Sequence, residues 1–441
     1  MKHKLIFLAL ASCFFFPSCN KEYINPSAAS TASVTTNTDA LMNLCAGLQR
    51  RFTIGRQSPL YTSVSGGVFS VFGAKTIVSS NVSEFELETG RGSVSTSNGI
   101  VSQMWTQCML GRTEAQTIFD NLSVAVDPGD KMGLKTYASI FYALNLGTLA
   151  QFFEKIPLVN GTNASFSSRT AALQKVITVL ESADVDLATI SISAKFLTKV
   201  PGGIDAKNTV KALLARYYNM LSMSNGPYDA IAGNKAIAYA QAASISIKSE
   251  FRFSVGTPNP MGDINVLGTV YGASDSTLGL RNGLAPVPAS TDPRIGFYIS
   301  KVGANYPFKG FCQTQPSSFP IYLPGEMSLI VAENLARQGS FGPAKTALDA
   351  VRTKTVDIYG VVANQIAYAG PLTTVDLLND IYKQRRIELF MCGQELEDSR
   401  RFGRNAPGLI ANPIDERNRT FYPYPLTERS NNTNTPPDPT I

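Results

Sequence analysis

Histidine is almost absent from this chain of 441 residues. The single histidine is His3, close to the N-terminus. The rest of the sequence has no imidazole for a Ser-His or Cys-His nucleophile and none for a histidine metal site. This absence excludes several large classes of hydrolase and metalloenzyme. We therefore expect neither a metal nor a cofactor.

Cysteine is also scarce. Apart from Cys13 and Cys19 near the N-terminus, the sequence contains Cys45, Cys108, Cys312 and Cys392. These four lie far apart, without the C-x-x-C spacing of a zinc or redox site. Cys45, Cys108 and Cys392 fall within helical patterns, in positions typical of small core residues. We predict buried thiols, with one disulfide as the alternative.

Charged residues make up only 16% of the chain, and the net charge is +6. Lysine and arginine alternate with aspartate and glutamate, whereas a nucleic-acid-binding protein gathers its basic residues on one face. We therefore expect no nucleic-acid partner. The hydrophobic content of 44% over this length is enough for a large folded core.

The N-terminal apolar run, Leu5–Phe16, is too short to span a bilayer. It follows basic residues and is followed by Ser18-Cys19, which is the layout of a secretion signal. A cysteine after a small residue at such a junction is where a bacterial lipoprotein is cleaved and acylated. We predict a signal peptide over residues 1–18 and acylation of Cys19, which would anchor the protein to a membrane without spanning it. Simple secretion is the alternative.

The next segment, residues 19–36, is rich in Ser, Thr, Ala and Asn, a composition typical of a flexible tether. From Asp39 onward, apolar residues recur every three or four positions, which predicts amphipathic helices. Two stretches read as helix, turn, helix: 205–248, divided by Asn225-Gly226, and 324–352, divided by Gly339. Residues 37–441 are therefore expected to form one mainly α domain of stacked helical pairs.

Long irregular stretches separate these helices, chiefly 53–97, 253–320 and 410–441. Ordered loops of this length are typical of binding surfaces, and aromatic rings beside amides suit a glycan or an oligopeptide. The candidate ligand contacts are Tyr61, Phe69, Phe72, Asn81, Tyr271, Asn282, Tyr298, Tyr306 and Phe308. Ordinary loop packing is the alternative for each of them. Trp105, the only tryptophan, falls on an apolar helical face and is expected in the core.

The C-terminal third carries a family resemblance. The runs Gln384–Leu389, Gly393–Glu395 and Arg400–Phe402, followed by Arg419–Pro425, resemble the closing segments of SusD/RagB-type lipoproteins. Gln384, Cys392 and Glu395 depart from that pattern, in which Glu, Glu and Arg are common. The resemblance implies a SusD-like α-α superhelix of tetratricopeptide-like helical pairs with long irregular ligand-binding loops. It also implies a lipid anchor in the outer membrane facing the cell exterior, and a SusC-like TonB-dependent outer-membrane transporter as partner.

The carboxylates near this segment allow a competing hypothesis. Glu395, Glu397 and Asp398 lie beside Arg400 and Arg401, so we expect ion pairs there, and a further pair between Arg385 and Glu388. Glycoside hydrolysis needs two carboxyls facing each other across a cleft, which this single run does not predict. The leading hypothesis is a non-enzymatic protein that captures a glycan or oligopeptide for the transporter. A surface glycoside hydrolase using only Asp and Glu, and a pocketless scaffold subunit, remain the alternatives.

Overall fold

Helices dominate the computed structural model, which describes residues 35–280 and 286–441. The α-helices in this part of the chain are α3 (Thr38–Thr53), α4 (Pro59–Ser70), α5 (Val82–Thr89), α6 (Gly99–Asp120), α7 (Pro128–Phe152), α8 (Arg169–Leu187), α9 (Ala194–Lys199), α10 (Ala206–Leu221), α11 (Ala230–Ala242), α12 (Pro260–Leu267), α13 (Pro293–Tyr298), α14 (Pro324–Arg337), α15 (Phe341–Arg352), α16 (Thr374–Glu388), α17 (Glu395–Arg401) and α18 (Leu426–Asn431). Two short 3₁₀ turns, Leu122–Val124 and Gly310–Cys312, complete the set. The mainly α fold class is confirmed.

The strands of the described residues are short and form two-stranded antiparallel sheets. They are β1 (Ala74–Thr76) with β5 (Tyr271–Ala273), β2 (Lys155–Pro157) with β3 (Phe166–Ser168), and β4 (Glu250–Phe251) with β6 (Phe319–Pro320). The first of these sheets joins two stretches that the sequence leaves irregular, since Ala74 pairs with Ala273 and Thr76 with Tyr271.

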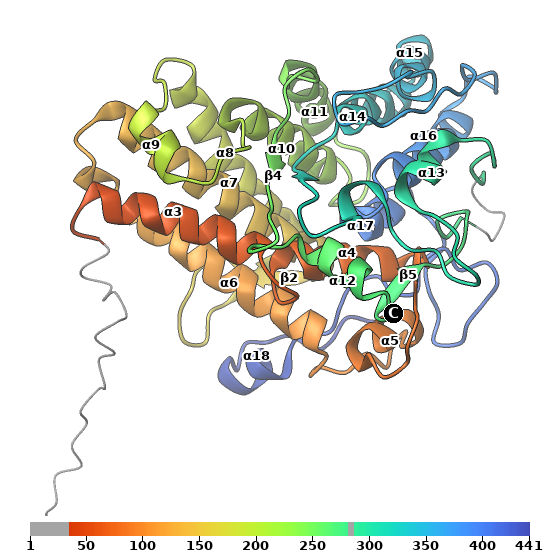
Figure 1. The fold of residues 1–441 in the computed structure, drawn as a ribbon, viewed down its shortest axis with the longest axis horizontal. Helices are drawn as coiled ribbons and strands as arrows, with labels where there is room; N and C mark the ends of the chain where they lie inside the picture. Colours follow the sequence, from red (N-terminus) through yellow and green to blue (C-terminus); the bar gives the residue numbers. More distant parts are fainter. Residues whose placement is uncertain (1–34, 281–285) are drawn as a thin grey trace, which may run out of the picture.

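Consecutive helices pack against each other along most of the chain. α6 packs on α7, α7 on α8, α8 on α10, α10 on α11, and α14 on α15 and α16, while α11 also contacts α14 (Figure 1). Each pair buries its apolar faces between its two helices, as helical repeats do. The expected helical pairs are thus present, and α7 lies between α6 and α8.

The pairs begin and end where local chemistry dictates. The side chain of Asn37 accepts a hydrogen bond from the backbone N–H of Ala40 at the start of α3, and Asp205 caps α10 through Asn208 N–H. The predicted apolar face of α3 is buried at Leu41, Cys45 and Leu48. α11 begins at Ala230, where the side chain of Asp229 supplies the cap, and ends at Ala242, before the end of the predicted stretch 205–248.

The expectation of an irregular stretch over 53–97 is wrong, because this stretch contains α4 and α5. Ser58 caps α4, and Pro59 occupies its first turn. All twelve residues of α4 are buried. A helix enclosed on every side has no polar face and hence no 3.6-residue periodicity to recognise. The stretches 253–320 and 410–441 also contain short helices, but most of their length is irregular.

The segment before α18 returns to the N-terminal half of the chain. Backbone N–H groups of Asn418, Tyr422 and Leu426 donate to the carbonyls of Ser70, Phe152 and Thr96. This segment therefore fastens α4, the end of α7 and the loop before α6 to one another.

The cysteine prediction is confirmed for the residues that the structure describes. Cys45, Cys108, Cys312 and Cys392 are free thiols, the first three of them buried. Burial raises the pKa of the Cys45 thiol, as expected of an inert core residue. Cys19 and the predicted signal and tether lie outside the described residues, apart from 35 and 36. Within those residues, no helix is both long and apolar enough to cross a bilayer.

Candidate functional site

The aromatic candidates fall into a buried group and a half-buried group. Five of them, Tyr61, Phe69, Tyr271, Tyr298 and Phe308, are at most 3% exposed. The expectation that these rings face solvent is therefore wrong. Asn282 lies outside the described residues. The remaining three, Phe72, Asn81 and Tyr306, are half-buried.

The buried rings form a continuous cluster that joins the loops to the helices. The Tyr271 ring lies 4.9 Å from Phe69 and 5.6 Å from Phe308, measured between ring centroids. Phe390 lies 6.0 Å from Tyr298 and extends the cluster. The hydroxyls find partners inside the protein, since Tyr271 bonds with Ser65 (2.7 Å) and Tyr298 donates to the Glu388 carbonyl (2.5 Å). These rings pack the loops onto α4 and the residues after α16.

The half-buried candidates lie around the β1–β5 sheet. Phe72 precedes β1, and its carbonyl accepts a hydrogen bond from Ser274, which follows β5. Tyr306 forms a bridge with Ala273 of β5, and Asn81 donates to the Thr269 carbonyl just before that strand (2.9 Å). The structure thus brings Phe72, Asn81 and Tyr306 to one small sheet from two distant stretches of sequence. Figure 1 shows β5 near α5 and α12, away from the stacked pairs.

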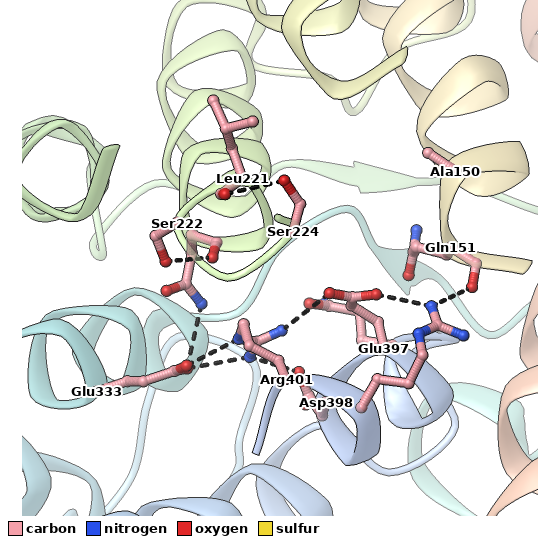
Figure 2. A network of polar contacts seen from close by, with 12 residues as sticks. Ala150, Gln151, Leu221, Ser222, Ser224, Glu333, Glu397, Asp398 and Arg401 are labelled. Carbon is pink, nitrogen blue, oxygen red and sulfur yellow. Dashed lines mark hydrogen bonds and ion pairs between the residues drawn. The ribbon is translucent and has the colours of Figure 1, made fainter. Parts of the chain in front are cut away.

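The carboxylates of α17 are held in an arginine network in the interior (Figure 2). Arg401 donates to both oxygens of Glu333 on α14, at 2.8 and 3.0 Å, and to Asp398 at 2.7 Å. Burial favours the neutral acid, but the guanidiniums of Arg401 and Arg337 outweigh it and lower the pKa of Glu333 to about 2. Glu397 pairs with Arg169 and Arg400 in the same network. The predicted ion pairs of Glu397 and Asp398 are confirmed.

Two of the predicted ion pairs are wrong. Arg385 pairs with Asp398 and not with Glu388, whose carboxylate is bound by Arg294 and Lys354. Arg385 and Glu388 point away from α16 toward different parts of the protein. Each therefore pairs with a residue outside α16 and not with the other. Glu395 forms no ion pair among the described residues, and both of its buried carboxylate oxygens lack a well-formed hydrogen bond.

The pKa of Glu395 is shifted in the opposite direction from that of Glu333. Burial raises its pKa to about 7, although the nearby Arg386 opposes the shift. A carboxyl with such a pKa suits a general acid, but its oxygens are enclosed, and a Cβ added to Gly67 would lie 2.4 Å from one of them. No substrate can reach this group in the folded protein.

Trp105 lies in the core as predicted. It is 2% exposed, and its indole N–H donates to Glu428 of α18 at 3.0 Å. The indole stacks near Phe166 at 6.0 Å and meets Phe153 edge-on at 4.8 Å. The only indole therefore ties the C-terminal helix to α6, and no face of it is left for a ligand.

Two surface pockets flank the helical pairs. One, of about 390 Å³, has Phe421, Arg169, Arg400 and Glu397 among its lining residues. Arg400 stacks over the Phe421 ring at 4.4 Å, and burial lowers the pKa of Arg400 to about 10 despite the Glu397 carboxylate. The other, of about 450 Å³, lies between the α11–β4 loop, α14 and the end of α15. Both volumes suit a ligand of sugar size.

Comparison with known proteins decides the fold. No family model matches the sequence, and no curated protein matches it. Solved structures do match. A SusD homolog from Bacteroides thetaiotaomicron superposes with a TM-score of 0.69 at 14% identity, covering 90% of this chain and 97% of that one. The chain has the fold of the SusD/RagB superfamily.

Two further SusD-fold structures match equally well. A putative sugar binding protein from Bacteroides vulgatus gives a TM-score of 0.69 at 15% identity, covering 92% of this chain and 98% of that one. A SusD-like carbohydrate binding protein from Bacteroides fragilis gives 0.68 at 15% identity, with 91% and 99% covered. The resemblance predicted from the C-terminal motifs is therefore confirmed for the fold of nearly the whole described chain.

Proposed function

We propose that this protein is a cell-surface, lipid-anchored binding protein that captures a glycan and delivers it to a SusC-like TonB-dependent outer-membrane transporter. The observation that carries the proposal is the near end-to-end match with SusD-fold proteins, two of which are described as binding sugar or carbohydrate. An oligopeptide is the second ligand class of the proposal. The half-buried Phe72, Asn81 and Tyr306 around β1 and β5 are the proposed ligand contacts of the loop face.

The environment of the carboxylates supports a binding protein over a glycosidase. A glycosidase requires one carboxyl that can give up a proton and a second that stays ionised, both open to the substrate. Glu397 and Asp398 are held by arginines, and Glu395 is enclosed. The hydrolase hypothesis depends on these three residues. Two of them form ion pairs that stabilise α17, and the third is buried away from solvent.

The test uses residues 37–441 and a panel of neutral and acidic glycans together with oligopeptides. We expect a ligand to raise the unfolding temperature, because a molecule that binds only the folded state stabilises it. No product should appear after long incubation. Release of shortened glycan would favour the hydrolase. If neither a glycan nor an oligopeptide of the panel binds, a scaffold subunit would be favoured.

The anchor and the partner are tested in cells. Metabolic labelling with a fatty-acid analogue should mark the wild-type protein and fail to mark Cys19→Ala. Affinity purification from detergent-solubilised membranes should recover a large TonB-dependent β-barrel protein. Labelling that persists in Cys19→Ala would contradict the anchor, and recovery of the protein without such a barrel would contradict the delivery role.

A further inference from the structure

Arg112 is a buried arginine without a carboxylate partner. It is 1% exposed and lies in the middle of α6, on the same buried face as Cys108 and Ala115. Its guanidinium donates to the Pro157 carbonyl and to the amide oxygen of Asn160, both at 2.5 Å. Neither oxygen carries a charge, and no ion pair of Arg112 occurs in the described part of the chain.

An uncompensated charge in this position is costly. Burial lowers the pKa of Arg112, which reports the loss of hydration around the guanidinium. Arginine nevertheless stays protonated in proteins, so the cost is not removed by neutralisation. Arg385 and Arg401, which are equally buried, have carboxylate partners, whereas Arg386 on α16 donates only to the Tyr382 hydroxyl and to two backbone carbonyls. Arg112 shares such neutral acceptors with Arg386, and its further property is that it lines a surface pocket.

Arg112 lies at a surface pocket of about 440 Å³ between α6, α7, α8 and the loop after β2. The charged residues lining this pocket are Arg112 and Lys175, both cationic. Gln116, on the rim, donates its amide N–H to Asp120, which is not part of the lining. The pocket thus presents two positive charges and no negative one.

Tyr142 supplies an unused polar group at the same place. Its side chain is 3% exposed and lines the pocket, and its hydroxyl has no hydrogen-bond partner among the described residues. The hydroxyl oxygen is not fully enclosed, so it is open to a molecule that enters the pocket. Leu158 and Val159 form an apolar wall beside these polar groups.

We propose that this pocket binds the carboxylate of an acidic sugar, a hexuronate unit. The planar guanidinium of Arg112 is suited to a carboxylate, with Lys175 adding charge and Tyr142 a hydroxyl donor. The volume exceeds that of a small inorganic anion and fits a monosaccharide, whose C–H face packs on Leu158 and Val159. The identification of the carboxylate with a sugar rests on the proposed function, whereas the anion site rests on Arg112 and Lys175, the two charged residues that line the pocket.

A purely structural role for Arg112 makes a different prediction. In that case Arg112 only fastens the β2–β3 hairpin to α6, and the pocket has no preference for anions. Arg112→Gln would then change stability, and no variant would change a ligand titration. The two roles are separated by Lys175, which lines the pocket, is exposed, and forms no hydrogen bond or ion pair with the β2–β3 hairpin.

The experiment is calorimetric titration of residues 37–441 with D-glucuronate, D-glucose and sodium sulfate at low ionic strength. We expect glucuronate to bind, glucose to give no heat, and sulfate to bind more weakly than glucuronate. Arg112→Gln should weaken glucuronate binding roughly tenfold or more, and Lys175→Gln roughly threefold. Lys131→Gln is the matched control, since Lys131 is an exposed lysine about 16 Å along α7 from Tyr142 and should bind as the wild type does.

Several outcomes overturn the proposal. Absence of binding by glucuronate, equal binding of glucose, or equal weakening by Lys131→Gln would each do so. Tighter binding of sulfate than of glucuronate would also refute a sugar carboxylate. If Arg112→Gln does not fold, Lys175→Gln and Tyr142→Phe decide, and both must weaken binding for the site to stand. Neutral glycans that bind elsewhere on the protein would leave the proposed function intact while this site fails.

Discussion

Arg401 and Glu333 form a bidentate ion pair inside the protein, with each side chain at most 1% exposed. It joins α17 to α14 through two residues that are 68 positions apart in sequence. Removing one partner leaves an uncompensated buried charge, whose cost far exceeds the value of an exposed pair. The ion-pair network around Arg401 therefore stabilises the packing of the helices in the C-terminal half.

The first prediction concerns the Arg401–Glu333 ion pair. Arg401→Met should lower the free energy of unfolding by about 3 to 5 kcal/mol, because Glu333 loses its main partner. Lys345→Met is the control, since its half-buried pair with Asp349, one turn along α15, is worth about 0.5 kcal/mol. Urea unfolding followed by Trp105 fluorescence measures both. Equal losses in the two variants would show that the buried pair has no special weight.

The second prediction is a pH dependence caused by Glu395. The folded-state pKa of about 7 lies above the ordinary value of 4.5, so the folded state holds the proton longer than the unfolded state. The contribution to stability is complete below pH 4.5 and is lost as the pH rises through 7. Over this window the loss amounts to about 3 kcal/mol.

Glu395→Gln removes this ionisation and keeps the shape of the side chain. The free energy of unfolding of the variant should therefore fall less than that of the wild type between about pH 5 and about pH 8. Chemical denaturation at a series of pH values gives the comparison, with the exposed Glu154→Gln as control. Parallel pH profiles of Glu395→Gln and wild type would refute the assignment.

The third prediction uses two glycines within long helices. A Cβ at Gly147 of α7 would lie 2.2 Å from the Tyr217 hydroxyl of α10, whereas a Cβ at Gly47 of α3 meets nothing within 4 Å. Gly147→Ala should cost about 1 to 3 kcal/mol through overpacking. Gly47→Ala should gain about 0.5 to 1 kcal/mol, because alanine restricts the unfolded chain and favours the helix. Thermal unfolding of both variants checks the opposite signs.

The fourth prediction separates core rings from loop-face rings. Tyr298→Ala should cost about 3 to 5 kcal/mol, because it opens a cavity in the aromatic cluster and leaves the Glu388 carbonyl without its donor. The half-buried Tyr306→Ala should leave helicity unchanged and, once a ligand is known, weaken its binding about threefold to tenfold. Circular dichroism and ligand titration provide the two readouts. Loss of folding in Tyr306→Ala would place this ring in the core.

Amphipathic helices could be predicted from the sequence, and fully buried ones could not. α3 and α10 show a polar face, a buried face and a capping residue, so their periodicity and their starts are visible. α4 shows none of this, because every residue from Pro59 to Ser70 is enclosed. Its capping residue Ser58 and the following Pro59 are the local signals that would have identified its start.

Candidate site residues were harder to predict than the fold. Glycine- and proline-rich composition identifies loops but does not tell which loops fold inward, and Tyr271 is buried because Ser65 and Phe69 of α4 lie beneath it. Arg112 was missed, although its spacing from Trp105, Cys108 and Ala115 follows the buried face of α6. A charged residue on an apolar helical face was therefore a usable signal.

The return of the C-terminal segment to α4 has a consequence for how the molecule assembles. Asn418 bonds to Phe69 across 349 sequence positions, so the first helices finish their packing only when the last part of the polypeptide arrives. Such distant closure slows folding and makes it a property of the whole chain. The C-terminal segment therefore holds the N-terminal helices in their final packing. Proteolytic cleavage in the exposed stretch around Leu409 and Ile410 should leave the N-terminal and C-terminal fragments bound to each other. The fragments should separate only in denaturant.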